Sequence, residues 1–157
     1  MVKKTPLIFN PSAHANKGSQ LADEIRKVST NIELIETKSF DHLKELVEGY
    51  VKDGIENICV AGGDGTINAV IDSILGTEIN LGVFPTGTMN LFAREMGLPL
   101  NNIKDCWNVI EKGKTKKIDI FKAGDSIFVQ VAGVGFDAKI IKAVSYTHLT
   151  LPTTPYV

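Results

Sequence analysis

Short apolar runs alternate with amphipathic stretches through the first 113 residues of the chain. Runs that are apolar throughout are typical of strands buried on both faces, and apolar positions three or four residues apart are typical of helices that bury one side. Strands are predicted at residues 5–10, 31–36, 57–61 and 80–84. The helices that follow them are predicted from four apolar stripes, formed by Leu21, Ile25 and Val28; by Phe40, Leu43, Leu46, Val47 and Val51; by Ile67, Val70, Ile71, Ile74 and Leu75; and by Ile103, Trp107 and Ile110.

This alternation predicts an α/β fold, with a parallel sheet covered by helices on both faces. The pattern changes at residue 114, where two strand-like runs flank Gly124 and Asp125 as in a β-hairpin. We therefore expect one unit at residues 1–113 and the start of a second, β-rich unit at residues 114–144. The hairpin, expected within residues 114–135, would leave an apolar face uncovered until later strands pack on it. That face consists of Ile118, Ile120, Ile127, Val129 and Val131.

Residues 145–157, SYTHLTLPTTPYV, differ from the rest of the chain. They contain no Asp, Glu, Lys or Arg, and they continue no periodic pattern. Because they resemble a translated sequencing adapter joined to a gene fragment, we interpret them as a non-native tail and leave them out of the fold prediction. An ordinary exposed tail is the alternative.

The composition is that of a globular protein with a substantial core. Of the 157 residues, 43% are hydrophobic and 22% are charged, and the formal net charge is -1. Since no global positive field favours nucleic acid, we expect no nucleic-acid partner. Cys59 and Cys106 lack the spacing of a zinc site, no signal peptide precedes the first predicted strand, and no apolar run reaches the ~18 residues of a membrane span. We expect a cytoplasmic protein that touches membranes only from outside.

The stretch VAGGDGTINAV at residues 60–70 leads from a predicted strand into a predicted helix. In open α/β sheets, ligands bind at this end of the strands, where loops turn into helices. Gly62, Gly63 and Gly65 would take positive φ values and let backbone N–H groups approach a phosphate at the positive end of the helix dipole. Thr66 could cap the helix or bind a phosphate oxygen, and Asn68 could add its amide.

Asp64 is the unexpected member of this stretch, because a carboxylate repels phosphate unless a divalent cation or a transferring proton lies between them. It therefore suggests catalysis as well as binding, and a carboxylate that caps the helix is the alternative. The stretch is neither a P-loop nor a GxGxxG fingerprint. A looser G-x-G-x-x-A match at residues 133–138 follows the end of the α/β alternation, so it is weak evidence for a dinucleotide site.

A second turn, within GVFPTGTMNLFAREMGLP at residues 82–99, follows the next predicted strand and contains Gly87, Thr88 and Asn90. Because parallel strands end at the same edge of a sheet, the two glycine turns would face each other across one crevice. Arg94, in the helix that starts there, could reach a phosphate or pair with a neighbouring acid.

Together, GGDGTIN and PTGTMNLFARE resemble the catalytic domain of the diacylglycerol kinase and sphingosine kinase superfamily, in its bacterial lipid kinase branch. The resemblance extends to residues 10–13, which look like the NPxSG opening of that family, and to AGVGFDA, and it covers residues 4–142. It implies a fold like the N-terminal domains of NAD kinase and phosphofructokinase. It also implies ATP-dependent transfer of the γ-phosphoryl group to a lipid hydroxyl, with Mg²⁺ as cofactor.

The same resemblance implies which residues act. Asp64 would be the catalytic residue, serving Mg²⁺·ATP or proton transfer, and no residue is assigned as a ligand of a structural metal. Ala69 and Leu91 stand where many members have Glu and Asp, and His14 follows Ala13 where a glycine is usual, which bears on substrate preference and nucleotide affinity. The implied nucleotide site consists of Asn10, Pro11, Ser12, Ala13, His14, Thr37, Gly62, Gly63, Asp64, Gly65, Thr66, Ile67, Asn68, Ala69, Gly87, Thr88 and Asn90.

In this family a β-rich domain follows the nucleotide-binding domain and carries a catalytic glutamate, metal ligands and much of the lipid cleft. The chain is therefore expected to be the nucleotide-binding half of a lipid kinase of phospholipid biosynthesis and to be inactive alone. Its substrate would be presented at a membrane surface, and a homodimer is compatible with this. The basic run at residues 112–117 would attract anionic headgroups or form a solvated loop. Two alternatives stay open, an NAD kinase, which shares a GGDGT turn, and a non-catalytic nucleotide-binding module.

Overall fold

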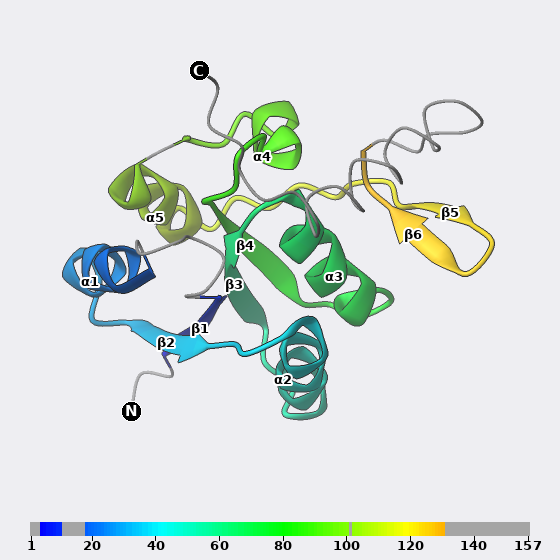
Figure 1. Ribbon diagram of the computed structural model, residues 1–157, viewed down its shortest axis with the longest axis horizontal. Helices are drawn as coiled ribbons and strands as arrows, with labels where there is room; N and C mark the ends of the chain where they lie inside the picture. Colours follow the sequence, from blue (N-terminus) through cyan, green and yellow to red (C-terminus); the bar gives the residue numbers. More distant parts are fainter. Residues whose placement is uncertain (1–3, 11–17, 101, 131–157) are drawn as a thin grey trace, which may run out of the picture.

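The computed structural model describes residues 4–10, 18–100 and 102–130 of the chain (Figure 1). The predicted alternation of strand and helix is present, and the ends of the four predicted strands differ from the observed ends by at most one residue. In chain order the elements are β1 (Thr5–Phe9), α1 (Gly18–Val28), β2 (Ile32–Glu36), α2 (Phe40–Lys52), β3 (Asn57–Gly62), α3 (Asp64–Ile74), β4 (Asn80–Pro85), α4 (Leu91–Glu95), α5 (Ile103–Glu111), β5 (Phe121–Ala123) and β6 (Ser126–Phe128).

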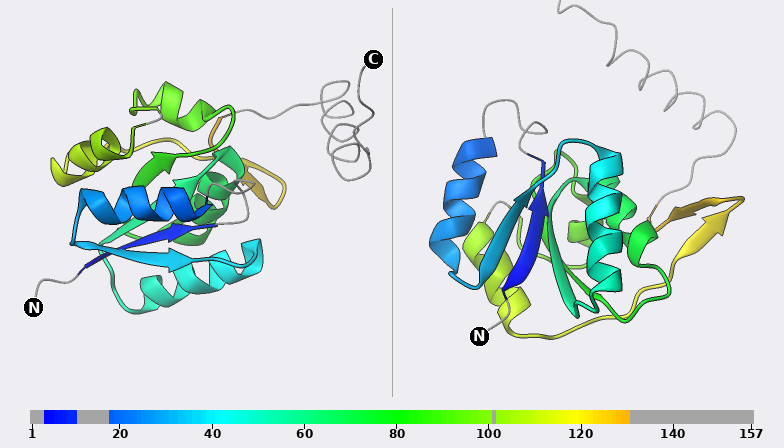
Figure 2. Two further views of the ribbon diagram at one scale, coloured as in Figure 1. Left: turned by 60° about the vertical axis from the view of Figure 1, so that its left-hand side comes forward. Right: turned by 90° about the horizontal axis from the view of Figure 1, so that it is seen from below.

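Strands β1 to β4 form a parallel sheet in the order β2-β1-β3-β4. Helices α1 and α5 cover one face and helices α2 and α3 cover the other (Figure 2). From β1 the chain goes to β2 on one side, and then crosses to β3 on the other side of β1. The strand order therefore reverses between β1 and β3, which is where open α/β sheets bind ligands beyond the carboxyl ends of their strands. The predicted α/β fold class is confirmed.

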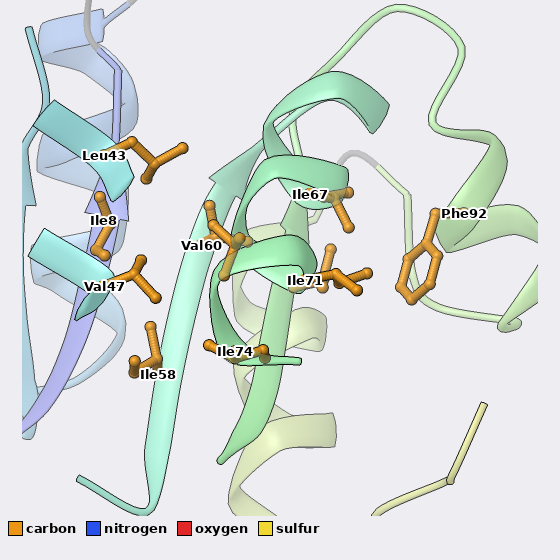
Figure 3. Close-up of a cluster of buried hydrophobic side chains, with 11 residues drawn as sticks. Ile8, Leu43, Val47, Ile58, Val60, Ile67, Ile71, Ile74 and Phe92 are labelled. Atoms are coloured by element: carbon orange, nitrogen blue, oxygen red, sulfur yellow. The ribbon is translucent and has the colours of Figure 1, made fainter. Parts of the chain in front are cut away.

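Alternate residues of a strand point to opposite faces of the sheet, so β1, β3 and β4 each contribute to two hydrophobic clusters. Burial on both faces explains why β1 and β3 are largely apolar, whereas the edge strand β2 contains two exposed glutamates, Glu33 and Glu36. The first cluster, on the side of α2 and α3, contains Ile8, Leu43, Val47, Ile58, Val60, Ile67, Val70, Ile71, Ile74, Val83 and Phe92 (Figure 3). The second cluster, on the side of α1 and α5, contains Leu7, Phe9, Ala22, Ile25, Cys59, Ala61, Phe84, Cys106 and Trp107.

Two members of the predicted helix stripes are exposed, so these two predictions were wrong. Phe40 is 59% exposed and Leu75 is 52% exposed. Phe40 is the first residue of α2, directly after the N-cap Ser39, and Leu75 follows the last residue of α3 and precedes Gly76 with φ 78°. At a helix end the chain is already turning toward its loop, so the helical period no longer points a side chain at the sheet.

The hairpin is present, but it is shorter than predicted. β5 and β6 pair antiparallel around a turn in which Gly124 has φ 61°. The rings of Phe121 and Phe128 stack across the two strands, with their centroids 5.6 Å apart. Neither Ile118 nor Ile120 belongs to a strand.

We call residues 114–130 the strap, because they run from the end of α5 to the far side of α3 (Figure 1). The expectation of an uncovered apolar face was wrong for the four side chains of that face that the structure describes. They are partly buried against the first cluster, and they are Ile118, Ile120, Ile127 and Val129. A hydrogen bond from Asn68 Nδ2 in α3 to the Ile127 carbonyl at 3.3 Å holds the strap as well. Val131 lies outside the described residues.

Both cysteines are buried free thiols. Burial raises the pKa of Cys59 to about 12. Burial, with a smaller contribution from the Asp105 charge, raises the pKa of Cys106 to about 11. Since the thiolate is the reactive form, these residues serve the packing of the core rather than nucleophilic chemistry. Within the described residues, no helix is long and apolar enough to cross a membrane.

Candidate functional site

The carboxyl ends of the four parallel strands bring the predicted site residues to one edge of the sheet. Asn10 follows β1, Thr37 follows β2, the glycine stretch follows β3 and the second turn follows β4. The strands end nearly level, because Phe9 pairs with both Glu36 and Ala61. The part of the predicted site at residues 11–14, which comprises Pro11, Ser12, Ala13 and His14, lies outside the described residues. The remaining predicted residues therefore lie along the carboxyl edge or in the first turns of α3.

The glycine stretch starts α3 and leaves its first turn open. Gly63 is the N-cap, and its carbonyl accepts the first helical hydrogen bond, from the Ile67 N–H at 3.0 Å. The N–H groups of Asp64, Gly65 and Thr66 have no partner within the helix. Gly65 is exposed, and a Cβ added to it would meet no described atom within 4 Å. The helix start therefore presents backbone donors to an open space, as anion sites do.

The predicted positive φ was wrong, because none of the glycines of the motif has one. At Gly62 and Gly63 the missing side chain allows a close approach of neighbouring protein atoms instead. A Cβ on Gly62 would lie 2.6 Å from the Cβ of Thr66, and one on Gly63 would lie 3.2 Å from the Cα of Gly87. Gly63 has φ -90°, a value open to any residue. The missing side chains thus make room for neighbouring protein atoms at Gly62 and Gly63, and leave open space only at Gly65.

The second turn is closed by Asn90, which is 4% exposed and has a left-handed backbone with φ 50°. Its Oδ1 accepts a hydrogen bond from the Gly87 N–H, and its Nδ2 donates to the Gly87 carbonyl, both at 2.8 Å. Asparagine is one of the few residues that adopt this backbone readily. Thr88 and Met89, between these two residues, are exposed. Asn90 therefore shapes a loop that carries Thr88 outward.

The two turns touch each other, so the predicted crevice between them is absent. The Thr86 N–H donates to the Gly62 carbonyl at 3.1 Å. A Cβ on Gly87 would lie only 2.5 Å from the Cα of Gly63. This contact of two backbones is possible only because both positions are glycine. The two turns form a single rigid surface, and a ligand would lie over it.

Asp64 makes a contact that neither of its predicted roles included. Its Oδ1 accepts a hydrogen bond from the Phe92 N–H of α4 at 2.9 Å, and the residue is half-buried. Asp64 does not cap its own helix, because Gly63 is the N-cap of α3. The alternative, in which the carboxylate caps the helix after its own turn, was therefore wrong, and the carboxylate caps α4 instead. No pattern in the sequence pairs these two residues, which are 28 positions apart.

Several other predicted residues are engaged by the protein itself. Thr37 is buried, and both its N–H, at 2.8 Å, and its hydroxyl, at 3.3 Å, donate to the Phe9 carbonyl. The Ile67 side chain lies in the core, and Asn68 donates to the strap. Arg94 forms no ion pair with a neighbouring acid among the described residues, and its Nε donates to the Met89 carbonyl at 2.9 Å; its contact with a phosphate stays a prediction. A nucleotide role for Thr37, Ile67, Asn68 and Ala69 stays a prediction.

The opposite edge of the sheet is a poorer candidate for binding phosphate. Two shallow hollows lie there, between the amino ends of the strands and the ends of α2 and α3. Glu56 and Glu78 line one hollow, where an anion would meet negative charge; Glu56 and Lys4 line the other, where their opposite charges offset each other. Among the described residues, no three His, Cys, Asp or Glu side chains gather closely enough to hold a metal ion.

The chain is similar to known proteins in both sequence and fold. A family model described as the diacylglycerol kinase catalytic domain matches residues 4–123. A diacylglycerol kinase of Mycobacterium tuberculosis is 34% identical over 102 residues, which are 62% of this chain and 33% of that protein. One of Staphylococcus aureus is 29% identical over 141 residues, 86% of this chain and 44% of that protein. The crystal structure of a diacylglycerol kinase from Bacillus anthracis matches with a TM-score of 0.68 at 26% identity, covering 80% of this chain and 49% of that one. The chain thus spans less than half of the length of each of these relatives.

Proposed function

We propose, on the premise that this chain belongs to the diacylglycerol kinase catalytic domain family, that it binds ATP by its phosphates at the carboxyl edge of the sheet. In this proposal the chain is the nucleotide-binding part of a lipid kinase, which transfers the γ-phosphoryl group to a lipid hydroxyl. The family relationship supports the reaction class. The geometry of the carboxyl edge supports the proposed location of the nucleotide site.

The observation that carries the proposal is the open first turn of α3. Asp64, Gly65 and Thr66 present N–H groups there without helical partners, and the space in front of Gly65 is free of described atoms. The N-terminus of an 11-residue helix adds a partial positive charge. Backbone donors and a positive dipole are the features that bind phosphate in α/β proteins.

The side chains around this turn have distinct proposed roles. The exposed Thr88 would contact a phosphate oxygen from the second turn, and Gly63 and Gly87 would keep the surface under the nucleotide flat. Asp64 suits a magnesium-bound nucleotide, because Mg²⁺ is held in proteins by one or two carboxylates together with the phosphates of its nucleotide. When bound, Mg²⁺ neutralises charge on the phosphates as the phosphoryl group moves.

The lipid acceptor, its presentation at a membrane surface and a cytoplasmic location are further parts of the proposal. The lysines of the basic run at residues 112–117 are all exposed, which suits attraction to anionic headgroups. Two free thiols suit a reducing compartment. We propose residues 114–144 as the start of a second unit and residues 145–157 as a non-native tail. Lipid transfer would need this second unit, because phosphoryl transfer depends on the positioning of the acceptor.

A chimeric enzyme tests the lipid kinase function. The aligned segment of the Staphylococcus aureus diacylglycerol kinase is replaced by that of this chain, and transfer from labelled ATP to diacylglycerol in mixed micelles is measured. We expect transfer within about 100-fold of the parent enzyme, because a small misplacement at the junctions can cost that much. The 157-residue chain alone is expected to transfer no label.

The matched control is the same chimera with Asp64→Asn. We expect it to melt at the temperature of the chimera and to have a kcat at least ~100-fold lower, the usual lower range for the loss of an acid-base group. A folded chimera that bound ATP and transferred nothing to lipid would contradict the proposed reaction.

A further inference from the structure

We propose that Asp64 is a positioning residue, whose carboxylate caps α4 and thereby holds the turn that carries Thr88. The inference rests on the proposed function, since it assigns to Asp64 a task in building the nucleotide site that is separate from any contact with Mg²⁺. The evidence is the bond from the Phe92 N–H to Asp64 Oδ1, together with the way α4 begins.

Helix α4 cannot cap itself. Its N-cap, Asn90, makes no side-chain bond to the first turn of the helix, because its amide is used twice on Gly87. The Phe92 N–H is one of the first N–H groups of the helix, which have no helical partner. Asp64 Oδ1 supplies that partner from α3, at 2.9 Å.

The bond has a large effect on α4 because that helix is short. It has five residues, fewer than an isolated helix needs to be stable in water. A negative charge at its N-terminus is favourable, and hydrogen bonds to ionised carboxylates are the stronger kind. Phe92 also buries its ring in the first hydrophobic cluster beside Ile67 and Ile71 (Figure 3). Asp64 therefore fixes the backbone of a residue whose side chain is already anchored.

The position of Thr88 depends on what holds the two ends of its loop. On one side, Gly87 lies against Gly63 and is held by Asn90. On the other side, the helix that follows Asn90 is held by Asp64. Both ends of the loop are therefore tied to the glycine stretch, so Thr88 is held beside the start of α3. Without the cap, the Phe92 ring would still be anchored in the first cluster, but the backbone of Phe92 would no longer be tied to α3.

Replacing Asp64 by asparagine or by alanine distinguishes the capping hydrogen bond from the effect of the negative charge. Asp64→Asn loses the charge and keeps an oxygen that can accept the Phe92 N–H, whereas Asp64→Ala loses both. In Asp64→Ala we expect the Phe92 amide to exchange with deuterium at least 10-fold faster than in the wild type. We also expect ATP measured in EDTA to bind at least 5-fold more weakly to Asp64→Ala than to Asp64→Asn. Asp64→Asn keeps an acceptor but loses the charge, so its Phe92 amide should exchange at a rate between those of the wild type and Asp64→Ala.

The matched control is Asp72→Ala, which removes another carboxylate from α3, one that lies 3.6 Å from Lys44 Nζ. It should change neither quantity, and the Val60 amide in β3 should stay protected in every variant as proof of folding. Wild-type exchange at Phe92 in Asp64→Ala, or equal ATP affinities of the two variants, would overturn the positioning role. A wild-type chain that did not bind ATP would contradict the proposed function instead, and the exchange rates would still decide whether Asp64 caps α4.

Discussion

Replacing Gly87 by valine should disrupt both turns and abolish measurable ATP binding. A Cβ at this position would lie 2.5 Å from the Cα of Gly63 and 2.9 Å from Oδ1 of Asn90. The first neighbour is backbone and the second is held by two hydrogen bonds, so neither can move without breaking the contact between the turns. Overpacking of this kind costs about 3 kcal/mol. In a chain of this size that lowers the melting temperature by about 10 °C.

Gly49→Ala is the matched control for Gly87→Val. Gly49 lies inside α2, and a Cβ on it would meet no described atom within 4 Å. Since glycine inside a helix is less stable than alanine by about 0.5–1 kcal/mol, this variant should melt slightly higher and bind ATP as the wild type does. If Gly87→Val melted and bound ATP like the wild type, the account of two turns in direct contact would be wrong.

Removing the strap should destabilise the protein and cause it to self-associate. We compare a chain that ends at Gly113 with one that ends at Gln130, so that any difference in melting temperature or oligomeric state is due to residues 114–130. The shorter chain loses four apolar side chains that are partly buried on the first cluster, each worth about 1 kcal/mol. We expect it to melt about 10 °C below the longer chain and to form oligomers in size-exclusion chromatography, because the uncovered cluster would become an apolar patch.

A point variant tests the polar part of the same contact. Asn68→Ala in the longer chain removes the bond to the Ile127 carbonyl and should lower the melting temperature by only a few degrees, since a net hydrogen bond is worth about 1 kcal/mol. Equal melting temperatures of the two chain lengths would show that the strap contributes nothing to the first unit.

The sheet and its helices could be predicted because their signal is local and periodic. Three strands of the parallel sheet are mostly apolar runs, β2 alternates apolar residues with glutamates, and most stripe residues face the sheet. The predicted burial was wrong at Phe40 and Leu75 because a stripe does not show where a helix ends. The prediction for the strap was also wrong, since the apolar positions of a hairpin do not show which surface will cover them. In this chain the covering surface is the side of α2 and α3, which lies earlier in the sequence.

The candidate site could be located from the sequence, but its construction could not. Glycines after two adjacent strands correctly indicated one edge of the sheet. The predicted positive φ was wrong for these glycines. Gly63 is a glycine because it packs against the backbone of Gly87, a contact that forms only in the folded sheet. The same holds for Asp64, whose partner is a backbone N–H with no mark in the sequence. Asn90 had a readable signal, since a buried asparagine in a tight turn suits a left-handed backbone.

Calorimetric titration of ATP into the wild-type chain and into Gly65→Ala tests whether the start of α3 binds phosphate. Gly65 is exposed with open space before it, and alanine is the better helix former by up to about 1 kcal/mol. The variant should therefore fold at least as stably as the wild type, so any loss of affinity reports on the ligand alone. We expect ATP to bind the wild-type chain and to bind Gly65→Ala at least 10-fold more weakly, because the added methyl group would occupy the place of a phosphate. Equal affinities, or no binding to the wild-type chain, would contradict a phosphate site at the start of α3.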